Sequence, residues 1–204
     1  MPEYTAEELI TIPLVASDNL ISRSNGAWDI ESLESMARLF AGRPVELNHN
    51  WDEVEKTVAK VYDAQIIKSA AAPDGLLGEG TIRDRNLGIV AKSGFAQLVL
   101  HAFVEATHPI VNELRYARLG DISTGGFTDG TYICPLCDVS FDDPTCPHFI
   151  PDPVTLFWLE ISGEDFNPEL IAPYYIRSGF CDAVEVSFVL CGNLPGARVP
   201  REGD

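Results

Sequence analysis

The spacing of four metal-ligating residues is the feature that most constrains how this chain can fold. Cys134-Pro-Leu-Cys137 is followed by Cys146-Pro-His148, which gives the pattern C-x2-C-x8-C-x-H. Three thiolates and one imidazole can complete a tetrahedron around one ion, and Zn²⁺ prefers such a ligand set. Four protein ligands leave no open position, so the pattern predicts a structural zinc ion held by Cys134, Cys137, Cys146 and His148. Metal binding would supply the folding energy that the short polar loop between the pairs lacks.

The composition around this motif differs from that of the rest of the chain. Over residues 128–153, Pro, Asp, Cys and Gly replace aliphatic residues, which predicts a small zinc module inserted into a larger domain. We expect a single domain over residues 1–197, with 198–204 as a tail. The odd number of cysteines and the absence of a secretory signal argue against a disulfide framework and favour a reducing compartment. Cys181 and Cys191 are expected to be buried small hydrophobes.

The charge balance narrows the classes of partner. The chain has 14 Lys and Arg against 31 Asp and Glu, a net charge of −17, so its surface should repel nucleic-acid phosphates. No apolar run is long enough for a membrane span. Between Arg118 and Arg177 there is no Lys or Arg at all, and this stretch favours a metal ion or a basic partner.

The pattern of apolar residues predicts a β-rich α+β domain, arranged as a barrel with two or three helices. Pro13 places the first strand at a sheet edge, and Asp29 can cap the first helix. Strands are expected over residues 8–15, 44–48, 57–68, 76–83, 121–123, 154–161 and 184–190, and helices over 30–40, 93–106 and 109–118.

Two residues are candidates for nucleophilic catalysis. Ser123 lies at a strand end before Gly125 and Gly126, where the backbone can turn sharply and its N–H groups can face an oxyanion. A serine hydroxyl needs a base, and His49, at the end of an apolar strand, has the best context of the four histidines. His148 is assigned to the metal. The Gly-x-Ser-x-Gly elbow of α/β-hydrolases is absent.

Five short strings occur in an order that resembles the prohead proteases of tailed bacteriophages, which share the herpesvirus assemblin fold. A strand runs into a histidine at 45–50, a Lys-Val strand follows at 58–64, and a Gly-Leu-x-x-x-Gly-x-Ile-like string lies at 75–82. The nucleophile string is Ile122-Ser123-Thr124-Gly125-Gly126-Phe127, in which Gly126 is additional to the family pattern. A Glu-Val-Ser strand at 185–189 leads to a Pro/Gly/Ala-rich exit.

The resemblance implies a herpesvirus-protease-like β-barrel with two or three flanking helices. The small zinc-knuckle insertion is predicted from the cysteine and histidine spacing and would be an elaboration of that fold, because many members of the family lack it. The resemblance also implies a serine endopeptidase that cleaves scaffold or delta segments of an immature phage capsid. Ser123 would attack the scissile carbonyl and His49 would take its proton. Glu185, which matches the Glu-Val-Ser strand, is the first choice to hold the imidazole, and Glu160 is the second.

The same resemblance implies where the protein works and with what. Its partners would be the phage scaffold and major capsid protein, and it would act in the host cytoplasm inside the assembling prohead. The oligomeric state stays open, with a homo-oligomer within the prohead as one option. Two alternatives from other classes stay open. In the first, the chain is a non-catalytic capsid-associated structural protein that retains this fold. In the second, it is a zinc-stabilised interaction module.

Overall fold

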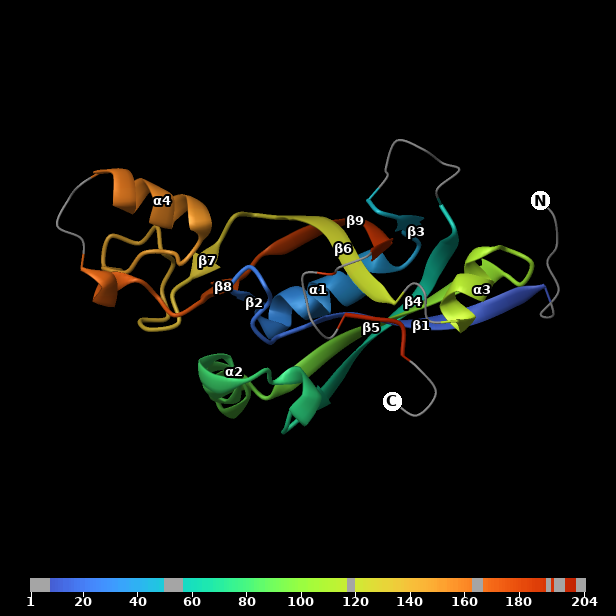
Figure 1. The fold of residues 1–204 in the computed structure, drawn as a ribbon, viewed down its shortest axis with the longest axis horizontal. Coiled ribbons are helices and arrows are strands. Elements are labelled where there is room, and N and C mark those ends of the chain that lie inside the picture. The colour runs from blue at the N-terminus through green and yellow to red at the C-terminus, as the bar shows by residue number, and fades with distance from the viewer. Residues whose placement is uncertain are drawn as a thin grey trace.

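The body of the protein is one six-stranded sheet that curls into a half-barrel (Figure 1). The computed structural model describes residues 8–49, 57–116, 120–162, 167–189, 192 and 197–200. In spatial order the strands are β1 (Leu9–Asp18), β5 (Phe95–Glu105), β4 (Ala59–Ser69), β3 (Pro44–Leu47), β9 (Phe180–Val189) and β6 (Asp121–Thr128). Neighbours are antiparallel except β3 and β9, which are parallel. The expected β-rich α+β class is confirmed.

A second sheet and the helices complete the described structure. The second sheet has the order β2 (Gly26–Trp28), β8 (Tyr175–Arg177) and β7 (Tyr132–Ile133). The α-helices are α1 (Ile30–Phe40), α2 (Gly80–Ser93), α3 (Ile110–Arg115) and α4 (Pro153–Ser162), and short 3₁₀ helices cover Asp74–Leu76 and Pro168–Leu170. Among the residues described, no helix combines the length and the apolar character that crossing a membrane requires.

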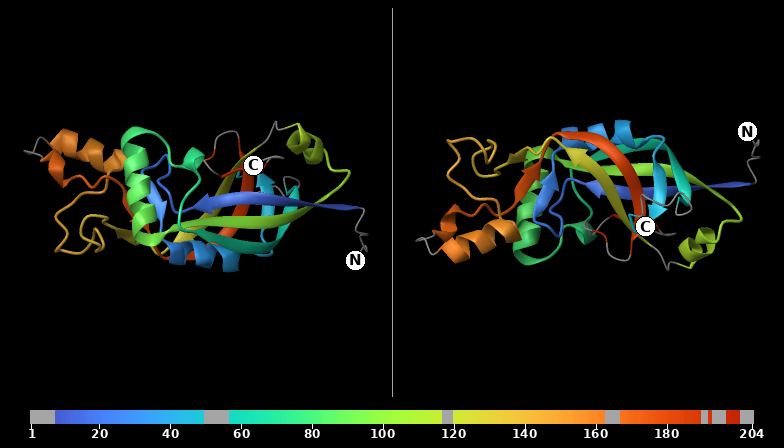
Figure 2. Two further views of the ribbon diagram at one scale, coloured as in Figure 1. Left: turned by 90° about the horizontal axis from the view of Figure 1, so that it is seen from below. Right: turned by 90° about the horizontal axis from the view of Figure 1, so that it is seen from above.

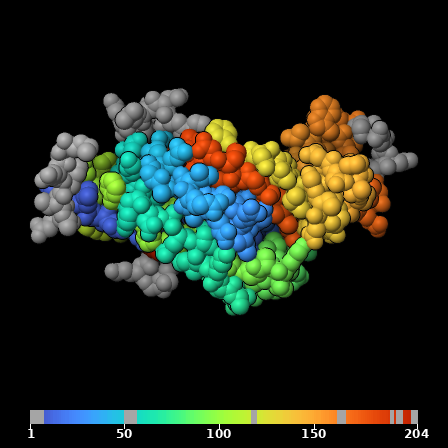
Figure 3. Space-filling view, turned by 180° about the vertical axis from the view of Figure 1, so that it is seen from behind, coloured from blue at the N-terminus to red at the C-terminus, as the bar shows by residue number. Residues whose placement is uncertain are grey.

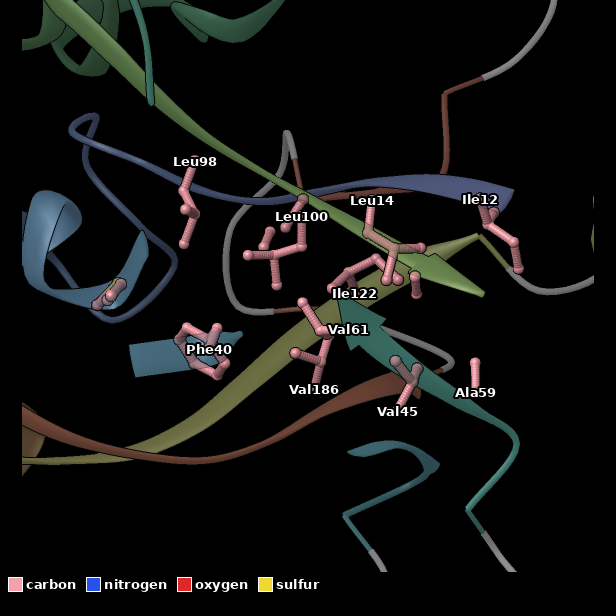
Figure 4. Packing of buried hydrophobic residues seen from close by; sticks show 14 of the residues in the cluster. Ile12, Leu14, Phe40, Val45, Ala59, Val61, Leu98, Leu100, Ile122 and Val186 are labelled. Carbon is pink, nitrogen blue, oxygen red and sulfur yellow. The ribbon is translucent and has the colours of Figure 1, made fainter. Parts of the chain in front are cut away.

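The core lies between α1 and the concave face of the half-barrel. Leu33, Met36 and Phe40 recur at helical spacing and are fully buried, and α1 packs on β4, β5 and β9. Figure 4 shows Phe40 among side chains of these strands, including Leu98 and Val186. The helix starts where the sequence predicts, because the Asp29 side chain accepts a 2.7 Å hydrogen bond from the Ser32 N–H.

The C-terminal segment connects the two edge strands of the half-barrel. Arg198 forms an antiparallel bridge with Val15 on β1 and another with Asp121 on β6. The Ile122 N–H also donates to the Ala197 carbonyl, and the Val199 N–H to the Gly120 carbonyl. Residues 197–199 therefore pair with the sheet rather than forming a loose tail after residue 197. Pro13 lies in the edge strand β1, as expected.

Two consecutive elements have the opposite structure to the one predicted. The segment expected as a strand over 76–83 contributes to the 3₁₀ helix and to α2, whereas the helix expected over 93–106 is the strand β5. In β5, alternate residues from Ala96 to Val104 face the core, and several between them are also partly buried. A strand that is apolar on both faces contains apolar pairs at helical spacing too, so periodicity alone misassigned it.

The predicted core strand at 154–161 is wrong, because these residues belong to α4. The helix lies in an insert that we define as residues 129–174, between β6 and β8, and that therefore extends well beyond the predicted end at 153. Figure 3 shows the insert as a lobe at one end of the molecule. The high apolar content of α4 indicated burial, but most of its side chains are exposed.

Candidate functional site

The candidate catalytic residues lie on or just after three adjacent strands, β3, β9 and β6, which run side by side in Figure 2 (right). Glu185 lies on β9 and Ser123 on β6, and His49 follows β3. Ser187 of β9 is the direct register partner of Ser123 on β6 and of Glu46 on β3. Directly opposed residues share one face of a sheet. Val186 and Phe188 fill the core, so Ser123, Ser187 and Glu46 form a polar row on the opposite face.

His49 reaches this row through an unusual turn. Asn48 and His49 have φ values of 56° and 55°, in the left-handed region that residues other than glycine rarely adopt. Such conformations cost about 1–3 kcal/mol each and persist where surrounding contacts fix them. Here the Asn48 N–H donates to the Phe188 carbonyl at 3.1 Å, and the His49 N–H donates to Ser187 Oγ at 3.0 Å.

The His49 imidazole is oriented by a buried carboxylate. Its Nδ1 lies 2.7 Å from Glu185 Oε1, and Glu185 is only 1% exposed. A carboxylate accepts, so Nδ1 carries the proton and Nε2 becomes the atom able to take one from a hydroxyl. Because 38% of the His49 side chain is exposed, the ring remains accessible.

The second oxygen of Glu185 is also engaged. The Ser187 hydroxyl donates to Glu185 Oε2, so the carboxylate is held on both sides. Ser187 thus links the backbone of His49 to the carboxylate that orients its ring. The sequence argument did not identify Ser187, although its position between the core residues Val186 and Phe188 placed it on the polar face.

Glu46 is a second buried carboxyl group beside this site, also missed from the sequence. It is 6% exposed, and its Oε2 has no hydrogen-bond partner within the described structure. Burial and then the nearby charge of Glu185 raise the pKa of Glu46, while His49 lowers it. Its position between Val45 and Leu47 was the available signal, because the alternation places it on the polar face.

Gly125 and Gly126 do not make the sharp turn that was expected after Ser123, because β6 continues through both of them to Thr128. A Cβ on Gly125 would lie 2.2 Å from Glu185 Oε1, and a Cβ on Gly126 would lie 2.5 Å from the Phe180 ring. Each glycine is therefore needed for close approach. The additional Gly126 is accommodated by a register shift between β6 and β9.

Glu160, the second choice for orienting the imidazole, lies elsewhere. It is an exposed residue of α4 in the insert. Of the two carboxylates left open by the sequence, Glu185 is the one bonded to His49.

The four predicted metal ligands converge within the insert. One ligand atom from each of Cys134, Cys137, Cys146 and His148 lies within 4.8 Å of the others. Cys134 Sγ and His148 Nδ1 are 3.5 Å apart, and Cys137 Sγ and Cys146 Sγ are also 3.5 Å apart. The remaining distances to His148 Nδ1 are 3.8 Å from Cys137 and 3.9 Å from Cys146.

These separations match a single tetrahedral ion. With metal–sulfur bonds of about 2.3 Å and metal–nitrogen bonds of about 2.0 Å, ligand atoms at the corners of a tetrahedron are about 3.5–3.8 Å apart. The thiols form no disulfide. This cluster can therefore hold a metal ion, with His148 Nδ1 as the nitrogen ligand.

The backbone around the first cysteine pair shapes the cluster. The Cys134 N–H donates to the Val139 carbonyl and the Asp138 N–H donates to the Cys134 carbonyl, which closes a tight turn containing Cys137. Asp138 has a φ of 59°, again in the left-handed region. The turn brings two thiols two residues apart onto the same side.

The two other cysteines have different outcomes. Cys181 was expected to be buried, but it is exposed on β9 with its thiol 3.5 Å from the Phe127 carbonyl. It lies at a register shift between β6 and β9, where the regular alternation of faces is lost. Cys191 lies outside the described residues.

Comparison with known proteins gives no relative. No model of a protein family, no curated protein and no solved structure matches this chain.

Proposed function

We propose that this protein is a serine endopeptidase with Ser123 as nucleophile, His49 as general base and Glu185 as the residue that positions His49. The observation that carries the proposal is the 2.7 Å contact between His49 Nδ1 and buried Glu185 Oε1, on the sheet face that also carries Ser123. A buried carboxylate bonded to one nitrogen of a partly exposed imidazole leaves the other nitrogen ready to accept a proton.

The proposed reaction follows from these positions. Ser123 Oγ forms a bond to the scissile carbonyl carbon while its proton moves to His49 Nε2. His49 then returns that proton to the leaving amine as the C–N bond breaks, and water releases the acyl group by the reverse use of the same base. Glu185 Oε1 accepts the hydrogen bond from His49 Nδ1 throughout and stabilises the imidazolium.

The order of the sequence strings supports the narrower proposal. Their resemblance to prohead proteases suggests a herpesvirus-protease-like fold and, as substrates, scaffold or delta segments of an immature capsid in the host cytoplasm. The major capsid protein and scaffold would be the partners, and the enzyme would assemble as a homo-oligomer within the prohead.

An active-site-directed reagent tests the catalytic proposal without knowledge of the substrate. A fluorophosphonate should label the wild-type protein at Ser123, as located by peptide mass mapping. Ser123→Ala should abolish labelling. His49→Asn and Glu185→Gln should slow it by roughly 10²-fold or more, because an unassisted serine is a poor nucleophile. Ser140→Ala, in the insert, is the control and should label normally.

Labelling of Ser123→Ala at the wild-type rate would refute the proposal. So would equal labelling rates in wild type and His49→Asn, because the serine would then need no base. Co-expression with the cognate scaffold and capsid proteins tests the substrate separately: cleaved bands should appear with wild type and be absent with Ser123→Ala.

We further propose that the ion of the Cys134, Cys137, Cys146 and His148 cluster is zinc and that its role is structural. Three thiolates and an imidazole suit Zn²⁺, and four protein ligands leave no position for a substrate. Among the residues of the insert that the structure describes, few apolar side chains are buried, so the ion would supply much of the folding energy of the insert.

Elemental analysis of the purified protein should find one zinc ion per chain. Cys137→Ser should lose it and leave the remaining cluster thiols open to alkylation. Cys181→Ser, which removes an exposed thiol outside the cluster, is the matched control and should retain it. A full-length wild-type protein that contains no zinc and whose cluster thiols react freely contradicts this assignment.

A further inference from the structure

The insert carries an apolar stripe on its outer surface. Val154, Phe157, Trp158 and Ile161 lie at positions i, i+3, i+4 and i+7 of α4 and are 64%, 57%, 62% and 54% exposed. On a surface helix, residues with this spacing usually face the core. In α4 the half-buried apolar side chains are instead Leu156 and Leu159, on the opposite side of the helix from the stripe, so the helix is apolar on both sides.

The stripe is a compact aromatic and aliphatic surface. The rings of Phe157 and Trp158 meet edge to face, with centroids 6.1 Å apart. Aromatic side chains on the outside of a helix are enriched at sites that bind other proteins. Contiguous exposed apolar patches on soluble proteins generally mark an interaction surface.

The charge of the insert selects the kind of partner. Residues 129–174 contain nine Asp and Glu and no Lys or Arg. Within α4 itself, Glu160 is exposed next to the stripe, and Asp152 begins the helix. Lys92 of α2 pairs with one of these carboxylates, that of Asp138, whereas Asp152 and Glu160 flank the stripe itself. An apolar surface flanked by carboxylates attracts a segment that combines large apolar side chains with Lys or Arg.

The same charge argues against the other occupants. A second copy would bring two inserts of the same sign together in a chain whose net charge is −17. Anionic lipid headgroups and nucleic-acid phosphates would be repelled as well.

We propose that the α4 stripe is a docking site for a basic, apolar segment of another protein, which places its apolar side chains on Val154, Phe157, Trp158 and Ile161. This inference does not depend on the proposed peptidase activity. It needs only the exposed stripe, its flanking carboxylates and the folded insert.

Two short synthetic helical peptides of the same length and leucine content test the proposal, one with lysine and one with glutamate at the polar positions. Binding to the full-length metal-loaded protein is measured by fluorescence anisotropy. The lysine peptide should bind more tightly by about tenfold or more, and its affinity should fall as salt is added. Glu160→Lys should weaken binding.

Matched substitutions locate the site. Phe157→Ser with Trp158→Ser should weaken the lysine peptide by about tenfold or more, because aromatic anchors dominate such contacts. Tyr62→Ser with Leu87→Ser, which removes apolar side chains of 49% and 44% exposure outside the insert, should leave affinity unchanged. If the first pair alters zinc content or circular dichroism, Val154→Ser with Ile161→Ser replaces it.

Several results would overturn the proposal. Equal affinity for the two peptides removes the role of charge, and equal losses in the stripe and control variants mean that binding is not on α4. A dimer in sedimentation that the stripe variants abolish identifies a second copy as the occupant. Binding to phosphatidylcholine vesicles, lost in the stripe variants and stronger than peptide binding, identifies a lipid surface.

Discussion

At the scale of single residues, the candidate catalytic site depends on one missing side chain. The Glu185 carboxylate occupies the space where a Cβ on Gly125 would lie. Gly125→Ala should therefore displace Glu185 from His49 and reduce the rate of fluorophosphonate labelling by about tenfold or more. Gly88→Ala is the control, since a Cβ there meets nothing within 4 Å. Unchanged labelling of Gly125→Ala would show that the Glu185 contact is not needed for reactivity.

Asp18, at the end of β1, makes stability depend on pH. Burial raises its pKa from 3.8 to about 6, against a smaller lowering by the hydrogen bond from the Leu20 N–H. The folded state then binds the proton more tightly than the unfolded chain does. The stabilisation from protonated Asp18 is present at low pH and is lost as the pH rises from about 4 to about 6.

Asp18→Asn should remove this pH dependence. The amide stays neutral, and its oxygen can still accept from the Leu20 N–H, so the variant should be more stable than wild type near neutral pH by up to roughly 3 kcal/mol. Urea unfolding of both proteins across this pH range measures the difference. The exposed Asp84→Asn is the control. A variant that is less stable than wild type at every pH would contradict the assignment.

The residues of the candidate site were only partly accessible from sequence. His49, Ser123 and Glu185 could be chosen because each lies in a short recognisable string, and the structure brings His49 and Glu185 into contact. For Ser187 and Glu46, alternation with core residues indicates only the polar face of a strand. Their place beside His49 and Glu185 arises from register across three strands that are far apart in sequence. The left-handed backbone conformation of Asn48 and His49 could not be predicted from the residue types alone either.

At the scale of elements, the sequence correctly predicted an element whose start and core-facing side are determined by its own residues. The helix α1 was placed correctly because its cap and its apolar stripe lie within its own sequence. By contrast, the structures of α2, β5 and α4 were predicted wrongly. Whether their apolar side chains are buried or exposed depends on the elements that pack against them, and these are not adjacent in sequence. For β5, the element that packs on the core face is α1, whose sequence is distant.

Two glycines, one inside α2 and one at its C-terminal cap, test how far the backbone preferences of single residues determine the stability of that helix. Gly88 lies inside the helix with open space around it, so Gly88→Ala should stabilise the protein by about 0.5–1 kcal/mol. Gly94 ends the helix at a φ of +76°, and a Cβ there would lie 3.3 Å from the Ser69 carbonyl. Gly94→Ala should destabilise by about 1 kcal/mol or more.

Urea denaturation of the two variants and wild type measures both effects in one experiment. The contrast between them is the informative quantity, because both variants add the same methyl group. Destabilisation by Gly88→Ala of the same size as that by Gly94→Ala would mean that α2 is not the regular helix described.

At the scale of the whole molecule, the sheet and the insert are organised around different features. The half-barrel has a continuous apolar core around α1, whereas the insert is organised around its Cys and His cluster. The insert emerges between the end of β6 and the start of β8, and β9 then returns along β6. The strands that carry Ser123 and Glu185 are therefore also the strands that anchor the metal module and α4.

The C-terminal segment gives the last prediction, because it connects strands from opposite ends of the chain. Val15 and Arg198 exchange two backbone hydrogen bonds of 2.8 Å, and the Ala197 carbonyl accepts from the Ile122 N–H beside Ser123. Ala197 is also buried. Truncation after residue 196 removes these bonds and exposes the edges of β1 and β6. At about 1 kcal/mol for each bond, we expect a loss of several kcal/mol in unfolding free energy and slower labelling of Ser123.

Truncation after Pro200 keeps every one of these bonds and is the control. Equal stability of the two truncated proteins in urea would show that the half-barrel holds its shape without the bridging segment.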